Sequence, residues 1–300
     1  MNMASSKHHV QHKQRLVSGM SVDIEDWFQV GAFEKVIDRR DWNGLSDRVD
    51  RNVRLILDLF DEACVKATFF TLGWVAARHN SLMQELVARG HEVASHGWDH
   101  ERVFTMDRAQ FAADIDRARK QIEDAGGVRV QGYRAPSFSI DSRTPWAFEV
   151  LAEKGYRYSS SVAPIRHDHY GWAEAPPFAF HPLEGQDLIE IPVTTAKLGS
   201  RRLGAGGGGF FRILPYHFSR WAISQNIYKF ERPAVFYFHP WEIDPDQPRV
   251  AAAPLRSRLR HYTKLEHMAG KLRRLLKEFS WGRMDELAQV EKARLESEAV

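Results

Sequence analysis

The sequence predicts an α/β fold in which parallel strands close into a barrel. Strand-like and helix-like segments alternate from residue 20 onward. About seven β-α units fit into roughly 230 residues, which suits one closed barrel better than two open sheets. The chain has 300 residues, 43% of them hydrophobic, which is enough for a sizeable core. Because catalytic groups collect where the strands of such barrels end, polar residues at strand ends are the candidates for a site.

Local signals define the units in order along the chain. Apolar residues at helical spacing predict a helix over 47–63, and glycines end the helices predicted over 75–89 and 108–125. The remaining segments are strands predicted over 20–26, 67–72, 92–95, 128–134, 156–162, 188–195 and 234–239, and helices predicted over 145–154 and 216–229.

Changes in composition divide the chain into three predicted parts. Residues 1–19 are expected to form a flexible leader, and residues 20–243 the barrel. Residues 244–300 contain a segment rich in Pro and Arg and then a basic amphipathic helix over 265–279. We expect this helix to pack on the barrel rather than to contact a membrane, because the charge of the whole chain is small.

Charge and cysteine content exclude several classes of protein. The net charge of +3 is too near neutral to indicate binding to nucleic acid or membranes. The start lacks the apolar run of roughly 7–15 residues of a signal peptide, and no segment approaches the roughly 20 residues of an integral membrane segment, which predicts a cytoplasmic protein. One cysteine, Cys64, excludes an internal disulfide framework and thiolate-rich zinc sites, so a metal would be held by imidazole and carboxylate groups. Cys64 itself is expected to be buried.

The first predicted strand ends in three carboxylates within four positions, Asp23, Glu25 and Asp26. On a strand Asp23 and Glu25 project to the same face, so their charges repel unless a cation or a shared proton lies between them. A solvated acidic loop is the alternative interpretation.

Two histidines, His96 and His100, follow the strand predicted over 92–95. Residues four apart share one face of a helical turn, so both imidazoles could bind one metal ion. A chain with 14 histidines in 300 residues would contain about 0.6 such pairs by chance. A metal site is favoured because His96 and His100 follow a strand and an acidic partner lies at the end of another strand.

Two other strand ends carry polar residues. Arg134 could orient a nearby carboxylate, and the turn at Pro136 could direct the Ser137 backbone N–H at an oxyanion. His239 ends an apolar strand, where a hydrogen-bonded core histidine is the usual alternative. The glycine-rich segment 204–209 matches a dinucleotide motif only formally, and we expect a mobile loop that lets the backbone approach a ligand.

Taken together and in this order, the four segments resemble the polysaccharide deacetylases with a NodB homology domain, carbohydrate esterase family 4, over roughly residues 20–241. The sequence HPWEIDPDQPR from His239, with the Arg-rich helix after it, resembles the subgroup encoded with bacterial exosortase and exopolysaccharide systems. The resemblance implies a distorted (β/α)7 barrel with a C-terminal helical extension. It also implies a metal-dependent hydrolase that removes N-acetyl groups from a polysaccharide or its precursor in exopolysaccharide biosynthesis.

The resemblance assigns a role to each candidate residue. Asp23 matches the family's catalytic base and His239 its general acid, while Arg134 belongs to the Arg-x-Pro motif. His96 and His100 match the metal-binding histidines, and the ion expected there is Zn²⁺, with Co²⁺ as an alternative. The Ser137 N–H and the ion would stabilise the oxyanion.

The chain departs from the family pattern at two places. The family has adjacent aspartates in its first motif, but Ile24 follows Asp23, so the carboxylate ligand is either Glu25 or Asp26. Strand alternation favours Glu25, and the shorter reach of the turn favours Asp26. The second departure is Ser159, which stands where the family often has an aspartate that tunes the catalytic histidine.

Three functions remain as hypotheses. The first is deacetylation of an N-acetylated glycan, with exopolysaccharide-assembly proteins as partners for the C-terminal basic helix and with no nucleic acid. The second keeps the fold but hydrolyses a small amide, as allantoinase-like relatives do, and the isoleucine at position 24 motivates it. The third is an inactive glycan-binding protein that uses the basic C-terminal segment.

Overall fold

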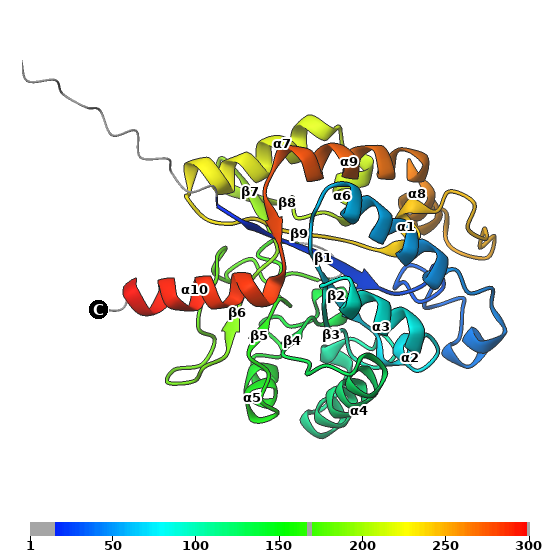
Figure 1. Cartoon of the computed structure of the whole chain (residues 1–300), viewed down its shortest axis with the longest axis horizontal. Coiled ribbons are helices and arrows are strands. Elements are labelled where there is room, and N and C mark those ends of the chain that lie inside the picture. The colour runs from blue at the N-terminus through cyan, green and yellow to red at the C-terminus, as the bar shows by residue number, and fades with distance from the viewer. Residues whose placement is uncertain (1–15, 167–169, 299–300) are drawn as a thin grey trace, which may run out of the picture.

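A curled sheet of parallel strands forms the centre of the molecule (Figure 1). The computed structural model describes residues 16–166 and 170–298, so 1–15 of the predicted leader lie outside it. Within the described residues the sheet has the order β10-β1-β2-β3-β4-β5-β6, and β9 pairs with β1. The strands are β1 Ser18–Ile24, β2 Thr68–Thr71, β3 Glu92–Ser95, β4 Gly132–Tyr133, β5 Tyr158–Ser159, β6 Ile189–Glu190, β9 Val235–Phe238 and β10 Trp281–Gly282.

Backbone contacts of two loops close the gap between β6 and β9. The Thr194 N–H donates to the carbonyl of Val235 at 3.3 Å, and Thr194 Oγ1 accepts from the Val235 N–H at 2.6 Å. Gly207 forms a parallel bridge to Tyr237. The strands from β9 through β1 to β6 therefore enclose a distorted barrel, and the predicted fold class is confirmed. A separate antiparallel ribbon, β7 Thr195–Leu198 with β8 Arg201–Gly204, replaces the end of the strand predicted over 188–195.

Helices follow most strands and cover the outside of the barrel (Figure 1). One helix predicted over 75–89 is in fact two, because His79 leaves the helical conformation with φ −126° and hydrogen-bonds Asp47. The helices of the barrel are α1 Val49–Glu62, α2 Gly73–Ala76, α3 Asn80–Ala88, α4 Arg108–Gly126, α5 Trp146–Glu153, α6 Gly208–Ile213 and α7 Tyr216–Ser224, which continues as a π-helical turn over Gln225–Lys229.

The segment after residue 243 adds both helices and a strand. It forms α8 Leu255–Tyr262, α9 Met268–Glu278, β10 and α10 Met284–Glu298. α9 covers most of the basic helix predicted over 265–279 and buries an apolar stripe in the main core cluster. β10 pairs with the start of β1, from Ser18 opposite Trp281, so the sheet does not end at residue 243.

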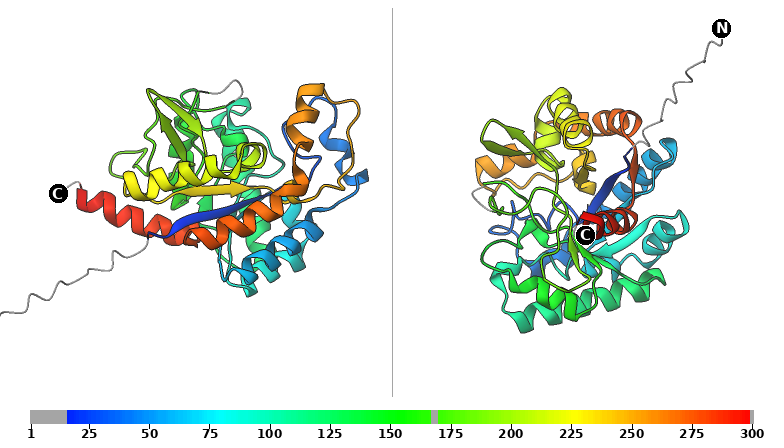
Figure 2. Two further views of the ribbon diagram at one scale, coloured as in Figure 1. Left: turned by 90° about the horizontal axis from the view of Figure 1, so that it is seen from above. Right: turned by 90° about the vertical axis from the view of Figure 1, so that its left-hand side faces the viewer.

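α10 closes the end of the barrel at which the strands begin. The right-hand view of Figure 2 looks along the barrel toward this helix. Its buried apolar residues, Met284, Leu287 and Ala288, share a cluster with Phe70 and Tyr158 from inside the barrel. The opposite end, where the strands finish, is left for the site.

Two further observations concern exposure. Cys64 is exposed rather than buried, because it lies in the turn after α1 with φ +52°. Over the described ranges no helix has the length and apolar composition needed to cross a membrane.

Glu92 on β3 connects the barrel to α10 and should make stability depend on pH. It accepts hydrogen bonds from the Tyr158 hydroxyl and the Asp285 N–H. Burial, followed by the Asp285 carboxylate, raises the pKa of Glu92 to about 8. Between about pH 4.5 and 8 the folded protein holds a proton that the unfolded chain has released, so the free energy of unfolding falls as pH rises.

We predict that Glu92→Gln removes this dependence. The fall in unfolding free energy between pH 5 and 8 should be smaller in the variant than in the wild type by about 1 kcal/mol or more. Denaturant titrations of both proteins at several pH values measure it. Exposed Glu153→Gln is the control and should keep the wild-type slope. An unchanged slope in Glu92→Gln would contradict the prediction.

Candidate active site

The polar residues predicted at four strand ends meet at one end of the barrel. Asp23 lies on β1 and Glu25 just after it, His96 follows β3, Arg134 follows β4 and His239 follows β9. Because parallel strands point the same way, their last residues share one edge and their side chains converge.

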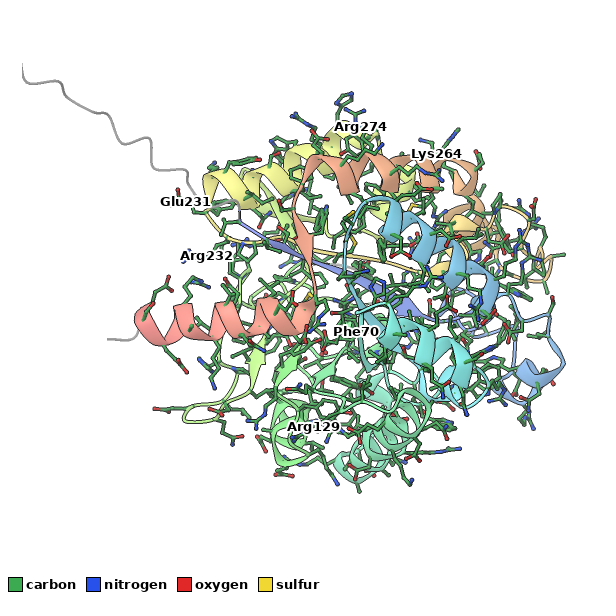
Figure 3. All side chains as sticks on the ribbon, in the orientation of Figure 1. Phe70, Arg129, Glu231, Arg232, Lys264 and Arg274 are labelled. Atoms are coloured by element: carbon green, nitrogen blue, oxygen red, sulfur yellow. The ribbon has the colours of Figure 1, made fainter. Side chains whose placement is uncertain are left out.

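Arg134 is fully buried and holds Asp23. Its Nη1 donates to Asp23 Oδ1 and to Ser21 Oγ, each at 2.7 Å. Its Nε and Nη2 donate to the carbonyl and hydroxyl of Ser160, and its guanidinium lies 4.1 Å from the ring centroid of Phe70, labelled in Figure 3. Every side of the guanidinium is therefore engaged, and Asp23 Oδ1 is fixed in place.

His96 is buried with one ring nitrogen already committed. Its Nδ1 lies 2.8 Å from the carbonyl oxygen of Arg134, which requires the proton on Nδ1. Burial lowers the pKa of His96 to about 4, so the imidazole is neutral near pH 7. The lone pair on Nε2 is thus free to bind a metal ion, and the carbonyl fixes the ring orientation.

Glu25 and His100 complete a cluster with His96. One potential ligand atom from each of the three lies within 4.8 Å of the other two. His100 Nε2 is 2.9 Å from Glu25 Oε2, yet that buried oxygen has no aligned hydrogen-bond donor among the described residues. Burial opposes ionisation, but His100 and His239 lower the pKa of Glu25 to about 2. One carboxylate and two imidazoles around an unsatisfied buried oxygen fit a divalent cation such as zinc.

The two histidines converge by a route that differs from the predicted helical turn. Residues 96–100 form a loop, with φ +76° at Gly97 and φ +63° at His100. The left-handed conformation turns the chain back, so the ring centroids of His96 and His100 lie 5.5 Å apart. A Cβ at Gly97 would lie 2.9 Å from the carboxylate of Asp114, so the loop needs glycine there.

Asp26, the other candidate ligand, is occupied elsewhere. Its carboxylate accepts from the N–H groups of Trp27, Arg48 and Val49, two of which belong to the start of α1. Burial raises the pKa of Asp26 to about 7. Asp26 therefore ties β1 to α1 and lies outside the cluster formed by Glu25, His96 and His100.

His239 lies beside the cluster, with Nε2 at 3.7 Å from Glu25 Oε1. Burial disfavours its charged form, but the carboxylates of Glu25 and Glu242 raise the pKa of His239 to about 9. The Trp241 ring stacks on the imidazole at a centroid distance of 5.2 Å and donates its N–H to Glu25 Oε1 at 3.1 Å. At neutral pH His239 is thus a cation that can give up a proton.

Sequence reasoning missed two residues behind His239, namely Glu242 and Arg212. Glu242 Oε2 lies 3.0 Å from His239 Nδ1, and Glu242 Oε1 accepts from Arg212 Nε at 3.0 Å. Both side chains are buried, and Arg212 also donates to the carbonyls of Arg260 and Thr263. The sequence signal that could have found Glu242 is its place three positions after His239, the candidate general acid. Nothing in the sequence links Glu242 to Arg212.

The glycine-rich loop packs closely against β9 and positions Arg212. Its role as a mobile ligand loop stays a prediction. Gly206, Gly207 and Gly208 are buried, and the carbonyl of Gly206 accepts from the Tyr237 N–H at 2.7 Å. Gly207 has φ +128°, and a Cβ there would lie 1.8 Å from the Tyr237 carbonyl oxygen. The loop lets α6 approach β9, which brings Arg212 to Glu242.

The carboxylate nearest Ser159 does not reach His239. Glu190 pairs with Ser159 in register across β5 and β6, but its carboxylate accepts from the N–H groups of Ser161 and Val162. Glu242 is therefore the residue in the position to tune His239. Ser137, the remaining candidate, adopts φ +55° in the turn after Arg134.

Two family models match consecutive parts of the chain. Residues 45–159 match the polysaccharide deacetylase model, and residues 160–289 match a domain of unknown function, DUF3473. The boundary between them falls between β5 and β6, so both parts contribute strands to one barrel.

Curated relatives match only short segments. A chitin deacetylase from Cryptococcus neoformans is 29% identical over 30% of this chain and 19% of its own length. A peptidoglycan deacetylase from Helicobacter pylori is 30% identical over 36% of each chain. A bifunctional xylanase/deacetylase from Pseudobutyrivibrio xylanivorans is 34% identical over 29% of this chain and 15% of its own. The chain thus spans well under half of these relatives.

Solved structures support the fold over nearly the whole chain. A putative polysaccharide deacetylase from Mycobacterium smegmatis has a TM-score of 0.58 at 19% identity, covering 92% of this chain and 91% of its own. A PuuE allantoinase also scores 0.58, at 16% identity over 90% and 88%. Residues 45–159 are therefore similar to polysaccharide deacetylases, and residues 160–289, which match DUF3473, complete the same barrel.

Proposed function

We propose that this protein is a metal-dependent hydrolase that removes N-acetyl groups from an N-acetylated glycan. The observation that carries the proposal is the cluster of Glu25, His96 and His100 between Asp23 on one side and His239 on the other. A base, a cation site and an acid in one place are what hydrolysis of an amide requires.

The roles follow from the contacts of each side chain. Glu25, His96 and His100 would hold a divalent ion, Zn²⁺ or alternatively Co²⁺, which when bound supplies Lewis acidity to a water and to the acetyl carbonyl. Arg134 holds Oδ1 of Asp23, which leaves Oδ2 to take a proton from the attacking water. The Ser137 N–H is the proposed donor to the oxyanion.

His239 would protonate the departing amine. An amine is a poor leaving group unless it receives a proton, and His239 is charged at neutral pH because Glu25 and Glu242 favour its cationic form. Glu242 accepts the Nδ1 proton, so Nε2 faces the site, and Arg212 holds Glu242 from behind. Acetate and a free amino sugar are the products.

Small amides form the second candidate substrate class, because the allantoinase and the mycobacterial deacetylase resemble this fold to the same degree. A panel of N-acetylglucosamine oligomers and allantoin separates the two by which compound is consumed. The role in exopolysaccharide biosynthesis, the assembly proteins as partners and the cytoplasmic location stay predictions from sequence.

Metal removal should abolish acetate release. We expect dialysis against a chelator to eliminate release from N-acetylglucosamine oligomers, and Zn²⁺ or Co²⁺ to restore it. His96→Ala, which removes a ligand without exposing new charge, should lower release by at least about a thousandfold. Release that persists in the chelated protein would refute the metal requirement.

The two candidate carboxylates should behave differently on substitution. Glu25→Ala should lose the bound metal, measured by elemental analysis after desalting, because it removes one of three ligands. Asp26→Asn is the matched comparison and should retain the metal while lowering the melting temperature, since it weakens the hydrogen bonds to the start of α1. The reverse pattern would assign the ligand to Asp26.

Glu242→Gln should impair amide cleavage far more than cleavage of an activated ester. Without the carboxylate His239 loses its charged partner, so release from the N-acetyl substrate should fall about a hundredfold or more. Hydrolysis of 4-nitrophenyl acetate, whose leaving group needs no proton, should fall much less. Because Arg212 loses its buried partner, the melting temperature is measured in parallel. Equal losses on both substrates would argue against this role.

A further inference from the structure

Helix α8 stands on the catalytic end of the barrel with most of its surface uncovered. His261 is its buried residue, and Ser257 is partly covered. Leu255 and Leu259 are 65% and 58% exposed. At 3.6 residues per turn these two leucines lie on the face opposite Ser257 and His261, so they point away from the protein.

Arginines flank the two leucines on both sides. By the same helical spacing Arg256 and Arg260 lie on one flank and Arg258 on the other, and all three are exposed. The stretch 247–264 contains four arginines and one lysine without a single Asp or Glu, although the whole chain carries only +3.

Ring contacts join α8 rigidly to the site. The ring of His261 stacks on Trp241 at a centroid distance of 4.1 Å, and Trp241 in turn stacks on His239. Arg212 donates to the carbonyl of Arg260 at the end of the helix. In Figure 1 α8 lies at the end toward which the arrow of β1 points, and Figure 3 labels Lys264 just after the helix.

We propose that α8 docks the catalytic end of the barrel onto an anionic lipid surface. Outward-pointing leucines with arginines on both flanks match such a surface, because the apolar side chains enter the boundary of the acyl region while the guanidinium groups bind phosphate headgroups. Two leucines are too few for a protein interface, which needs about 800 Å² on each partner. The docking does not depend on the proposed activity.

The test is co-sedimentation of the full chain with lipid vesicles. We expect binding to vesicles that contain phosphatidylglycerol, loss of binding at high salt, and little binding to phosphatidylcholine alone. Each arginine contributes about fivefold to such binding, so R256Q/R258Q/R260Q should weaken it about a hundredfold. L255S/L259S should weaken it at least tenfold.

Matched variants control for net charge and for exposed apolar surface. R51Q/R129Q/R201Q removes the same charge from exposed positions elsewhere, and Figure 3 labels Arg129 far from α8. L198S/V290S removes two other exposed apolar side chains. Both controls should bind as the wild type does.

Three outcomes would overturn the proposal: no binding to anionic vesicles, equal binding by the α8 variants and their controls, or a lipid-free dimer that L255S/L259S dissociates. The last would mean that a second copy of the chain covers the leucines. Because all substituted residues are exposed, the melting temperature of the variants should equal that of the wild type. A change in vesicle binding by such a variant then reflects the altered surface and not unfolding.

Discussion

The buried ion pair between Arg212 and Glu242 holds together the end of the barrel that carries the candidate site. Two charges removed from water are costly unless each is fully bonded, and here the remaining donors of Arg212 satisfy backbone carbonyls beside α8. Glu242 binds the imidazole of His239 with its second oxygen. One ion pair thus connects the helix that follows the glycine-rich loop, the imidazole of His239 and the carbonyl groups at the end of α8.

Most of the fold could be predicted because helical spacing and glycine ends are local signals. The helix that begins at Arg108 has both, with Asp107 and Gln110 capping its start and Gly127 its end. β10 and α10 could not be predicted in the same way. A two-residue strand has no periodicity, and Trp281 belongs to the sheet only because Ser18 lies opposite it.

The same division applies to the candidate site. Asp23, His96 and His239 were predicted because each ends a strand, and a shared direction of the strands brings strand ends together. The sequence could not decide whether Glu25 or Asp26 faces the two histidines. The structure separates them, because the carboxylate of Asp26 accepts a hydrogen bond from the start of α1. Sequence offered no link between Glu242 and Arg212, because the two residues lie 30 positions apart and no pattern between them reports their contact.

The pairing of Ser18 with Trp281 also affects how the protein can be made. On the ribosome β1 emerges long before its neighbour β10 and before α10, which fills the end of the barrel. Until then one end of the barrel interior, including Phe70 and Tyr158, has no cover. The nascent chain therefore stays partly folded during this interval, with apolar surface exposed to which chaperones can bind.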